Sequence, residues 1–250
     1  MLLENKNAVI YGAGAIGAAV ARTFAAEGAR VFLAGRTRTT LDVVAKEVHA
    51  AGGSAETAEV DALDENAVHA HADDVAARAG SLDVAFPLVG LQDVQGTPMA
   101  DMALSDFERP IHVAVRSTFL VWRAAARHMR GQGAGVLLAF GGEGDPMRDH
   151  YLGGFQIALH TVEAMRRQFA TELGADGVRV VTLRTGGIPE SIPADFAHKE
   201  AITKELEAAT LGGKTASLED LGNVAAFVAS DKARTMTAAT ANISCGALLD

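Results

Sequence analysis

Short apolar segments alternate with helical patterns along the whole chain, and this alternation restricts the possible fold more than any other feature of the sequence. The segments 8–11, 30–34 and 178–184 are largely apolar at successive positions, which indicates strands with both faces buried. Buried strands that alternate with helices predict a parallel sheet with helices on both faces. The sequence therefore predicts one α/β domain over residues 1–250, built on a doubly wound sheet.

The expected elements follow this rhythm without a linker, repeat or low-complexity segment. Pro110 falls inside a long helical pattern and predicts a kink or a break, because proline cannot donate the backbone hydrogen bond of a helix. Ligands of such sheets bind beyond the carboxyl ends of the strands, so we expect loops 90–103, 141–153 and 185–197 to surround the site. The strands are predicted at 8–11, 30–34, 55–60, 83–89, 135–140, 178–184 and 239–244, and the helices at 16–27, 39–51, 65–79, 104–130, 155–174, 201–209 and 218–230.

A glycine-rich turn, Gly12-Ala13-Gly14-Ala15-Ile16-Gly17, joins the first predicted strand to the first predicted helix. In this context the pattern G-x-G-x-x-G is typical of dinucleotide binding. Gly12 permits the tight turn, Gly14 lets the backbone approach a pyrophosphate, and Gly17 lets the helix pack against the strand. The free N–H groups of the helix start, near Ile16, are suited to hold the anion. The alternative is a glycine turn that serves packing alone.

The second predicted strand leads into Gly35-Arg36, where NAD-binding proteins usually place an acidic residue on the ribose 2′-hydroxyl. The guanidinium of Arg36 suits a 2′-phosphate instead, so the sequence favours NADP(H) as the cofactor. Asp61, after the third predicted strand, is a candidate acceptor for the adenine amino group. The alternatives are a surface arginine and an aspartate that caps the following helix. With the glycine turn, these residues make the predicted sheet Rossmann-like.

Charge and composition argue against several classes of partner. The formal net charge is −9, and the sequence has no basic face suited to a nucleic acid. No apolar run has the length of a membrane span, and no signal-peptide core follows Met1. The histidines and acidic residues show no metal-ligand spacing, so no metal is expected. We therefore expect a small-molecule substrate and a cytoplasmic location.

The chain has one cysteine, Cys245, so no intramolecular disulfide can form and a reducing compartment is favoured. The sequence around it predicts a strand and a turn, without an activating base. We therefore expect Cys245 to be a small buried residue and not a catalytic thiol.

Three further segments, 82–86, 179–191 and 223–231, carry family-like patterns, and the last is a helix that ends in Ala229-Ser230-Asp231. Together with the glycine turn they make the chain resemble the short-chain dehydrogenase/reductase family over nearly its whole length. The resemblance implies a parallel sheet of about seven strands with helices on both faces. It also implies a homodimer or homotetramer built on the two long helices.

The resemblance fails at the residues that this family uses for catalysis. The family has a serine after the fifth strand, a Tyr-x-x-x-Lys pair on the next helix and an asparagine on the helix before. The corresponding residues of this chain are Gly141, Phe155, Leu159 and Ala114, none of which can transfer a proton. The sequence therefore predicts that the family's standard ketone–alcohol mechanism is absent.

Other residues in the predicted pocket loops are candidates for the missing chemistry. Tyr151 precedes the tyrosine position by about one helical turn, His150 titrates near neutrality, and Glu143 follows the serine position closely. For each, the alternative is a solvated loop residue. The resemblance adds Gly90 and Ile188, in the loops after the fourth and sixth strands, to the expected cofactor contacts.

Three functions fit this pattern. The first is an oxidoreductase that binds NADP(H) and acts on a small organic carbonyl, imine or activated alkene, with an unusual proton donor or none. The second is a cofactor-independent dehydratase, cyclase or isomerase, which is supported by a glycine turn shorter than the family's and by Pro87 and Thr185 in two cofactor-binding segments. The third is a non-catalytic binding protein. We place the first ahead on the family resemblance.

Overall fold

The computed structural model describes residues 1–142 and 150–249, and its centre is a seven-stranded sheet in the order β3-β2-β1-β4-β5-β6-β7. Every pair of neighbouring strands is parallel, which confirms the predicted Rossmann-like doubly wound sheet. The strand order reverses between β1 and β4, the switch point at which ligands of open α/β sheets bind. The strands are β1 (Asn7–Tyr11), β2 (Arg30–Gly35), β3 (Ser54–Glu59), β4 (Val84–Pro87), β5 (Gly135–Gly141), β6 (Val178–Arg184) and β7 (Ala239–Asn242).

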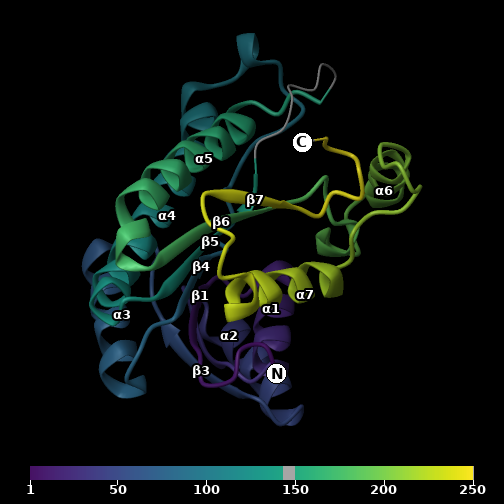
Figure 1. The fold of residues 1–250 in the computed structure, drawn as a ribbon. Coiled ribbons are helices and arrows are strands. Elements are labelled where there is room, and N and C mark those ends of the chain that lie inside the picture. Colours follow the sequence, from purple (N-terminus) through teal and green to yellow (C-terminus); the bar gives the residue numbers. More distant parts are fainter. Residues whose placement is uncertain (143–149, 250) are drawn as a thin grey trace.

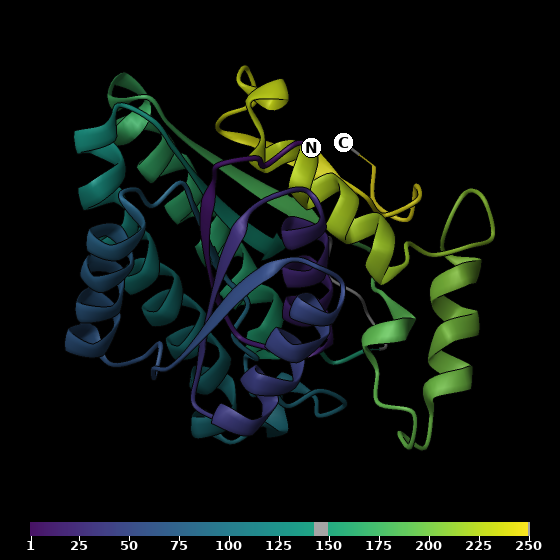
Figure 2. The same ribbon diagram turned by 90° about the horizontal axis from the view of Figure 1, so that it is seen from below.

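The helices in the described part of the chain are α1 (Ala15–Ala26), α2 (Arg38–Ala50), α3 (Glu65–Ala79), α4 (Leu104–Gln132), α5 (Gly154–Leu173), α6 (Lys199–Ala208) and α7 (Leu218–Ala229). Figure 1 shows α3, α4 and α5 on one face of the sheet and α1, α2 and α7 on the other. Helix α6 stands apart from both layers (Figure 2), where it contacts the short helical turn Pro189–Ser191.

Each face of the sheet has its own apolar core, because successive side chains of a strand point to opposite faces. Ala8 and Ile10 of β1 belong to the core under α1, α2 and α7. Val9 and Tyr11 of the same strand belong to the core under α3, α4 and α5, which includes the fully buried Trp122. The double burial explains why the strands are apolar at successive positions.

Helix α4 continues through Pro110 without a break, so of the two outcomes predicted for this proline the break is wrong. The proline is buried, and the loss of its N–H removes only one backbone hydrogen bond from a long helix. The start of α5 lies close against this part of α4. A Cβ on Gly154 would come 2.0 Å from the Phe107 carbonyl oxygen, so only glycine permits this approach.

Cys245 is exposed, so the expectation of a buried residue was wrong. Strand β7 ends at Asn242, and the cysteine lies beyond it in a turn with a φ of 54°. Its carbonyl oxygen accepts a hydrogen bond from Leu211 N at 3.2 Å. The prediction placed Cys245 just after the strand correctly, but the turn leaves its side chain exposed.

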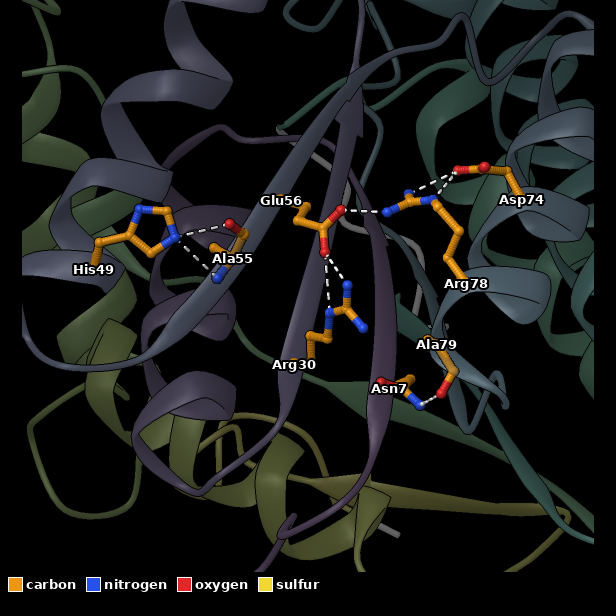
Figure 3. Close-up of polar contacts among 8 residues, drawn as sticks. All are labelled: Asn7, Arg30, His49, Ala55, Glu56, Asp74, Arg78 and Ala79. Atoms are coloured by element: carbon orange, nitrogen blue, oxygen red, sulfur yellow. Dashed lines mark hydrogen bonds and ion pairs between the residues drawn. The ribbon is translucent and has the colours of Figure 1, made fainter.

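Charged side chains attach the edge strand β3 to its neighbours. Figure 3 shows Glu56 of β3 between Arg30 of β2 and Arg78 of α3, paired with both, while Arg78 also pairs with Asp74 at 2.7 Å. The two guanidinium groups lie 4.9 and 5.8 Å from the ring centroid of Phe32. Burial alone would raise the pKa of Glu56, but the hydrogen bonds from Arg78 and Arg30 outweigh it and hold the pKa below its usual value.

A buried ion pair within α5 is connected to β6 by a hydrogen bond. Glu163 and Arg166 are 1% and 4% exposed, and Arg166 Nη2 lies 2.9 Å from Glu163 Oε2. Thr182 of β6 donates its hydroxyl hydrogen to the other carboxylate oxygen, Oε1. Arg166 Nη1 has no hydrogen-bond partner within the described residues. Within the described part of the chain, the Glu163 carboxylate is therefore the group that compensates this buried cation.

We expect Glu163→Ala to lower the free energy of unfolding by about 3–5 kcal/mol, because it leaves the Arg166 guanidinium buried without its partner. Glu172→Ala, at an exposed position of the same helix, is the control and should change the value by less than about 0.5 kcal/mol. Urea denaturation followed by circular dichroism measures both. Equal losses in the two variants would contradict the assigned role of the ion pair.

Candidate active site

The turn between β1 and α1 places its three glycines in different surroundings. A Cβ on Gly12, whose φ is 117°, would lie 2.2 Å from the Leu88 carbonyl oxygen. A Cβ on Gly17 would lie 2.0 Å from the Gly12 carbonyl oxygen, whereas one on Gly14 would meet no atom within 4 Å. Packing therefore requires glycine at positions 12 and 17, while Gly14 leaves the turn open to an approaching ligand.

Helix α1 presents unsatisfied donors at this turn. Its N-cap is Gly14, which has no side chain that could accept from the first N–H groups of the helix. These groups carry the partial positive charge of the helix end, which favours an anion. The sequence thus places the open side of the turn and the positive end of α1 at the same point.

An open cavity of about 430 Å³ extends from this turn across the ends of β2 and β3. It lies beyond the carboxyl ends of the strands, where ligands of open α/β sheets bind. Ile188, one of the eight predicted cofactor contacts, is 4% exposed in the apolar core and does not line this cavity. Seven of the predicted cofactor residues line it, namely Gly12, Gly14, Ile16, Gly17, Arg36, Asp61 and Gly90.

The ends of β2 and β3 supply different side chains to this outer cavity. The exposed Arg36 forms no ion pair with any residue of the described ranges, whereas the nearby Arg38 Nε lies 2.9 Å from Asp42 Oδ1. Asp64, and not Asp61, caps α3, because its side chain accepts from the Ala67 N–H at 3.0 Å. Asp61 Oδ1 accepts a hydrogen bond from the Leu63 N–H at 3.0 Å, so the Arg36 guanidinium and the other carboxylate oxygen of Asp61 remain available to a ligand.

A buried polar pair lies under the outer cavity. Tyr11, which lines the cavity, shares a hydrogen bond of 2.8 Å between its hydroxyl oxygen and His71 Nδ1. The two rings meet edge to face with centroids 5.4 Å apart. Burial raises the pKa of Tyr11 above its usual value and lowers the pKa of His71 from 6.5 to about 4. Both side chains are therefore neutral at neutral pH, and the pair fixes the end of β1 against α3.

A second cavity, of about 250 Å³, lies deeper in the molecule and shares Ile16, Leu88, Val89 and Gly90 with the outer one. The shared residues show that the two cavities adjoin. Its wall is mostly apolar and is formed by the end of β5, the middle of α4, the start of α5 and the loop after β4. The residues that line only this inner cavity are Pro87, Leu91, Asp93, Ala114, Ser117, Thr118, Ala139, Phe140, Gly141, Phe155, Leu159 and Val162.

Comparison with known proteins agrees with this geometry. The family model described as enoyl-(acyl carrier protein) reductase matches residues 12–247. The chain belongs to this family of short-chain dehydrogenases/reductases.

Similar proteins span nearly the whole of this short-chain dehydrogenase/reductase. The uncharacterized oxidoreductase YxbG of Bacillus subtilis is 30% identical over 94% of this chain and 88% of its own length. Secoisolariciresinol dehydrogenase of Forsythia intermedia is 29% identical over 93% and 85%. A short-chain dehydrogenase from Burkholderia cenocepacia in complex with NADP has a TM-score of 0.85 at 25% identity, with 99% of each chain covered. A short-chain type dehydrogenase/reductase from Mycobacterium ulcerans has a TM-score of 0.90 at 24% identity, with 99% and 91% covered.

The inner cavity of this short-chain dehydrogenase/reductase brings together the four residues predicted to stand at the family's catalytic positions. Ala114, Gly141, Phe155 and Leu159 all line it. Gly141 has a φ of 109°, and a Cβ there would lie 3.0 Å from Leu159 Cδ2. The hydroxyl of Ser117 donates to the Val113 carbonyl oxygen of its own helix at 2.7 Å. Ala114, Gly141, Phe155 and Leu159 have no side-chain proton to donate, and the Ser117 hydroxyl is engaged within its own helix.

Of the three candidate catalytic residues from the loop before α5, the two that the structure describes, His150 and Tyr151, line neither cavity. Glu143 lies outside the described residues. His150 Nε2 lies 2.7 Å from Glu205 Oε1 of α6, so it connects this loop to the projecting helix. Tyr151 is 43% exposed with a φ of 46°, and it is absent from the lining of both cavities. A catalytic role for these side chains stays a prediction.

The sequence reasoning did not single out two side chains that the structure places at the site. Asp93 lines the inner cavity from the loop after β4, and His71 supports the floor of the outer one from α3. Asp93 lies within a loop predicted to face the pocket, but loop spacing alone cannot show which of its side chains turns inward. His71 has no sequence signal, because its partner is 60 residues away.

Residues 1–142 and 150–249 contain no group of three or more histidine, cysteine, aspartate or glutamate residues that could hold a metal ion. None of the helices described is both long and apolar enough to cross a membrane.

The glycine turn gives a matched set of variants. Gly12→Ala should lower the free energy of unfolding by roughly 1–3 kcal/mol, because alanine at this φ is strained and overlaps the Leu88 carbonyl. Gly14→Ala has room for its methyl group and should change the value by less than about 1 kcal/mol. Thermal and urea denaturation of both variants tests the difference. A Gly12→Ala variant as stable as Gly14→Ala would contradict the close contact.

The Tyr11–His71 pair predicts a dependence of stability on pH. The folded state holds His71 neutral, so the unfolded chain takes up a proton at higher pH than the folded one. The contribution of His71 is complete above pH 6.5 and is lost as the pH falls from about 6.5 to about 4. His71→Asn removes the titrating group and should flatten the unfolding free energy across this window. His112→Asn, at an exposed position of α4, should keep the wild-type slope, and a flat wild-type profile would exclude the effect.

Proposed function

We propose that this protein is an NADP(H)-dependent oxidoreductase that acts on a small organic carbonyl, imine or activated alkene without the family's usual tyrosine and lysine. The observation that carries the proposal is that the two cavities adjoin at the switch point of the sheet. The outer one combines an open glycine turn with an arginine, and the inner one is apolar and adjoins it through Ile16 and Gly90. One ligand can therefore lie directly against another across the switch point.

The residues of the outer cavity fit a dinucleotide phosphate. Gly14 and the first N–H groups of α1 would hold the pyrophosphate, and Asp61 would accept from the adenine amino group. Arg36 would pair with the 2′-phosphate, since no described carboxylate occupies it. NADPH, when bound, supplies a hydride. The Burkholderia cenocepacia relative with NADP supports this choice of cofactor.

The inner cavity would position the substrate and exclude water from it. Phe155 and Leu159 present apolar surface where the family has a proton donor and the lysine that assists it. Gly141 likewise offers no hydroxyl to polarise a carbonyl oxygen. Such a wall suits a substrate that is already activated, or one whose proton comes from elsewhere.

A calorimetric titration of the purified protein with NADPH, and separately with NADH, tests the proposal. We expect micromolar binding that favours NADPH. No binding of either dinucleotide at millimolar concentration would overturn the proposal and direct attention to a redox-neutral dehydratase, cyclase or isomerase.

Arg36→Ala should weaken NADPH binding by roughly 1.5–3 kcal/mol, about ten- to 150-fold, because it removes a charge-assisted contact to the 2′-phosphate. NADH binding should stay the same. Arg38→Ala is the control, since that guanidinium is already engaged by Asp42, and it should leave both dissociation constants near the wild-type values. Equal NADPH affinity in Arg36→Ala and the wild type would remove Arg36 from the site.

A further inference from the structure

The inner cavity has one ionisable side chain among the described residues that line it, and this is Asp93. The other lining residues are apolar, are glycines or carry the hydroxyl groups of Ser117 and Thr118. A carboxylate beside apolar surface gains most from a partner of opposite charge. A ligand in this cavity would therefore meet one carboxylate in otherwise uncharged surroundings.

No cation of the protein, within the residues described, pairs with this carboxylate. Asp93 Oδ2 accepts a hydrogen bond of 2.7 Å from the side-chain amide of Gln95, which is neutral. The negative charge of Asp93 is thus left for a ligand. The formal net charge of −9 adds an attraction for cations at long range.

Backbone contacts hold Asp93 in place relative to the start of α5. The N–H of Gly96 donates to the Tyr151 carbonyl oxygen at 3.1 Å. The same two loops also meet at Gly153, where a Cβ would lie 3.4 Å from the Val94 carbonyl oxygen and 2.5 Å from Met102 Cε. The loop after β4 therefore packs closely on the loop before α5, and Asp93 and Phe155, from these two segments, both line the inner cavity.

We propose that the inner cavity binds a compact apolar cation, the iminium form of an imine and the ammonium form of its amine product, with Asp93 as the counter-ion. This inference rests on the proposed function and narrows its substrate class. An iminium nitrogen already carries the proton that a carbonyl oxygen would have to receive. The substrate thus needs an anion beside it and no proton donor at the place of Phe155.

The reaction balances without a further reagent. The carbon of the C=N⁺ bond accepts a hydride from a reduced nicotinamide, and the π electron pair moves to nitrogen. The iminium ion is thereby reduced to a neutral amine, the nicotinamide is oxidised, and the amine then takes a proton from water. Asp93 stabilises the cation before the hydride arrives and the ammonium product afterwards.

Binding without cofactor tests the role of Asp93 directly. Tetrahydroisoquinoline, protonated at neutral pH, and isochroman, its neutral oxygen analogue, are titrated calorimetrically against the protein alone. We expect the amine to bind about tenfold more tightly than isochroman, the size of one charge-assisted contact. Asp93→Asn should abolish this preference. Asp101→Asn, at an exposed residue of the same loop that lines neither cavity, should retain it.

Equal binding of the two probes to the wild type, absence of binding by both, or a preference that survives in Asp93→Asn would each overturn the inference. A separate NADPH titration distinguishes this failure from failure of the proposed function. If NADPH binds and the amine preference is missing, only the choice of a cationic substrate is wrong. With both ligands bound, NADPH-dependent reduction of dihydroisoquinoline should fall at least tenfold in Asp93→Asn and not in Asp101→Asn.

Discussion

Two backbone contacts at the switch point of the sheet determine the rest of the site. The Leu88 carbonyl oxygen would lie 2.2 Å from a Cβ on Gly12, and the Gly12 carbonyl oxygen would lie 2.0 Å from a Cβ on Gly17. The Leu88 N–H also donates to the Tyr11 carbonyl oxygen at 2.7 Å. These contacts bring β1, the start of α1 and the loop after β4 together. The helix end, the outer cavity and the entrance to the inner cavity are all positioned by this junction.

The apolar residues of the inner cavity fit one another. Gly141 adopts a φ of 109°, which disfavours any side chain, and Leu159 fills the space beside it at 3.0 Å from a hypothetical Cβ. A serine at position 141 would be strained and would press on Leu159. Restoring one polar residue of the family pattern would therefore disturb its neighbour. Under the proposed function, this contact between Gly141 and Leu159 favours a site adapted to another substrate.

The sequence predicted the features that depend on local pattern. Unbroken apolar strands such as 178–184 predicted a doubly buried parallel sheet, and the spacing of Gly12, Gly14 and Gly17 predicted a turn whose glycines differ in surroundings. It failed where distant segments decide the outcome. Cys245 is exposed in a turn whose backbone is hydrogen-bonded to Leu211, and the loop that carries Asp93 is held by a contact between two loops more than 50 residues apart, Gly96 with Tyr151. No pattern within either loop encodes that contact.

Under the proposed function and the inferred role of Asp93, the two cavities have opposite electrostatic character. This difference determines which ligand binds in which cavity. The outer cavity offers the positive end of α1 and the guanidinium of Arg36, both suited to the phosphates of a dinucleotide. The inner cavity offers the carboxylate of Asp93 in apolar surroundings. An anionic cofactor is disfavoured in the inner cavity and a cationic substrate in the outer one, so each would occupy its own one of the two adjoining cavities. The position at which they meet is set by Ile16 and Gly90, which line both cavities.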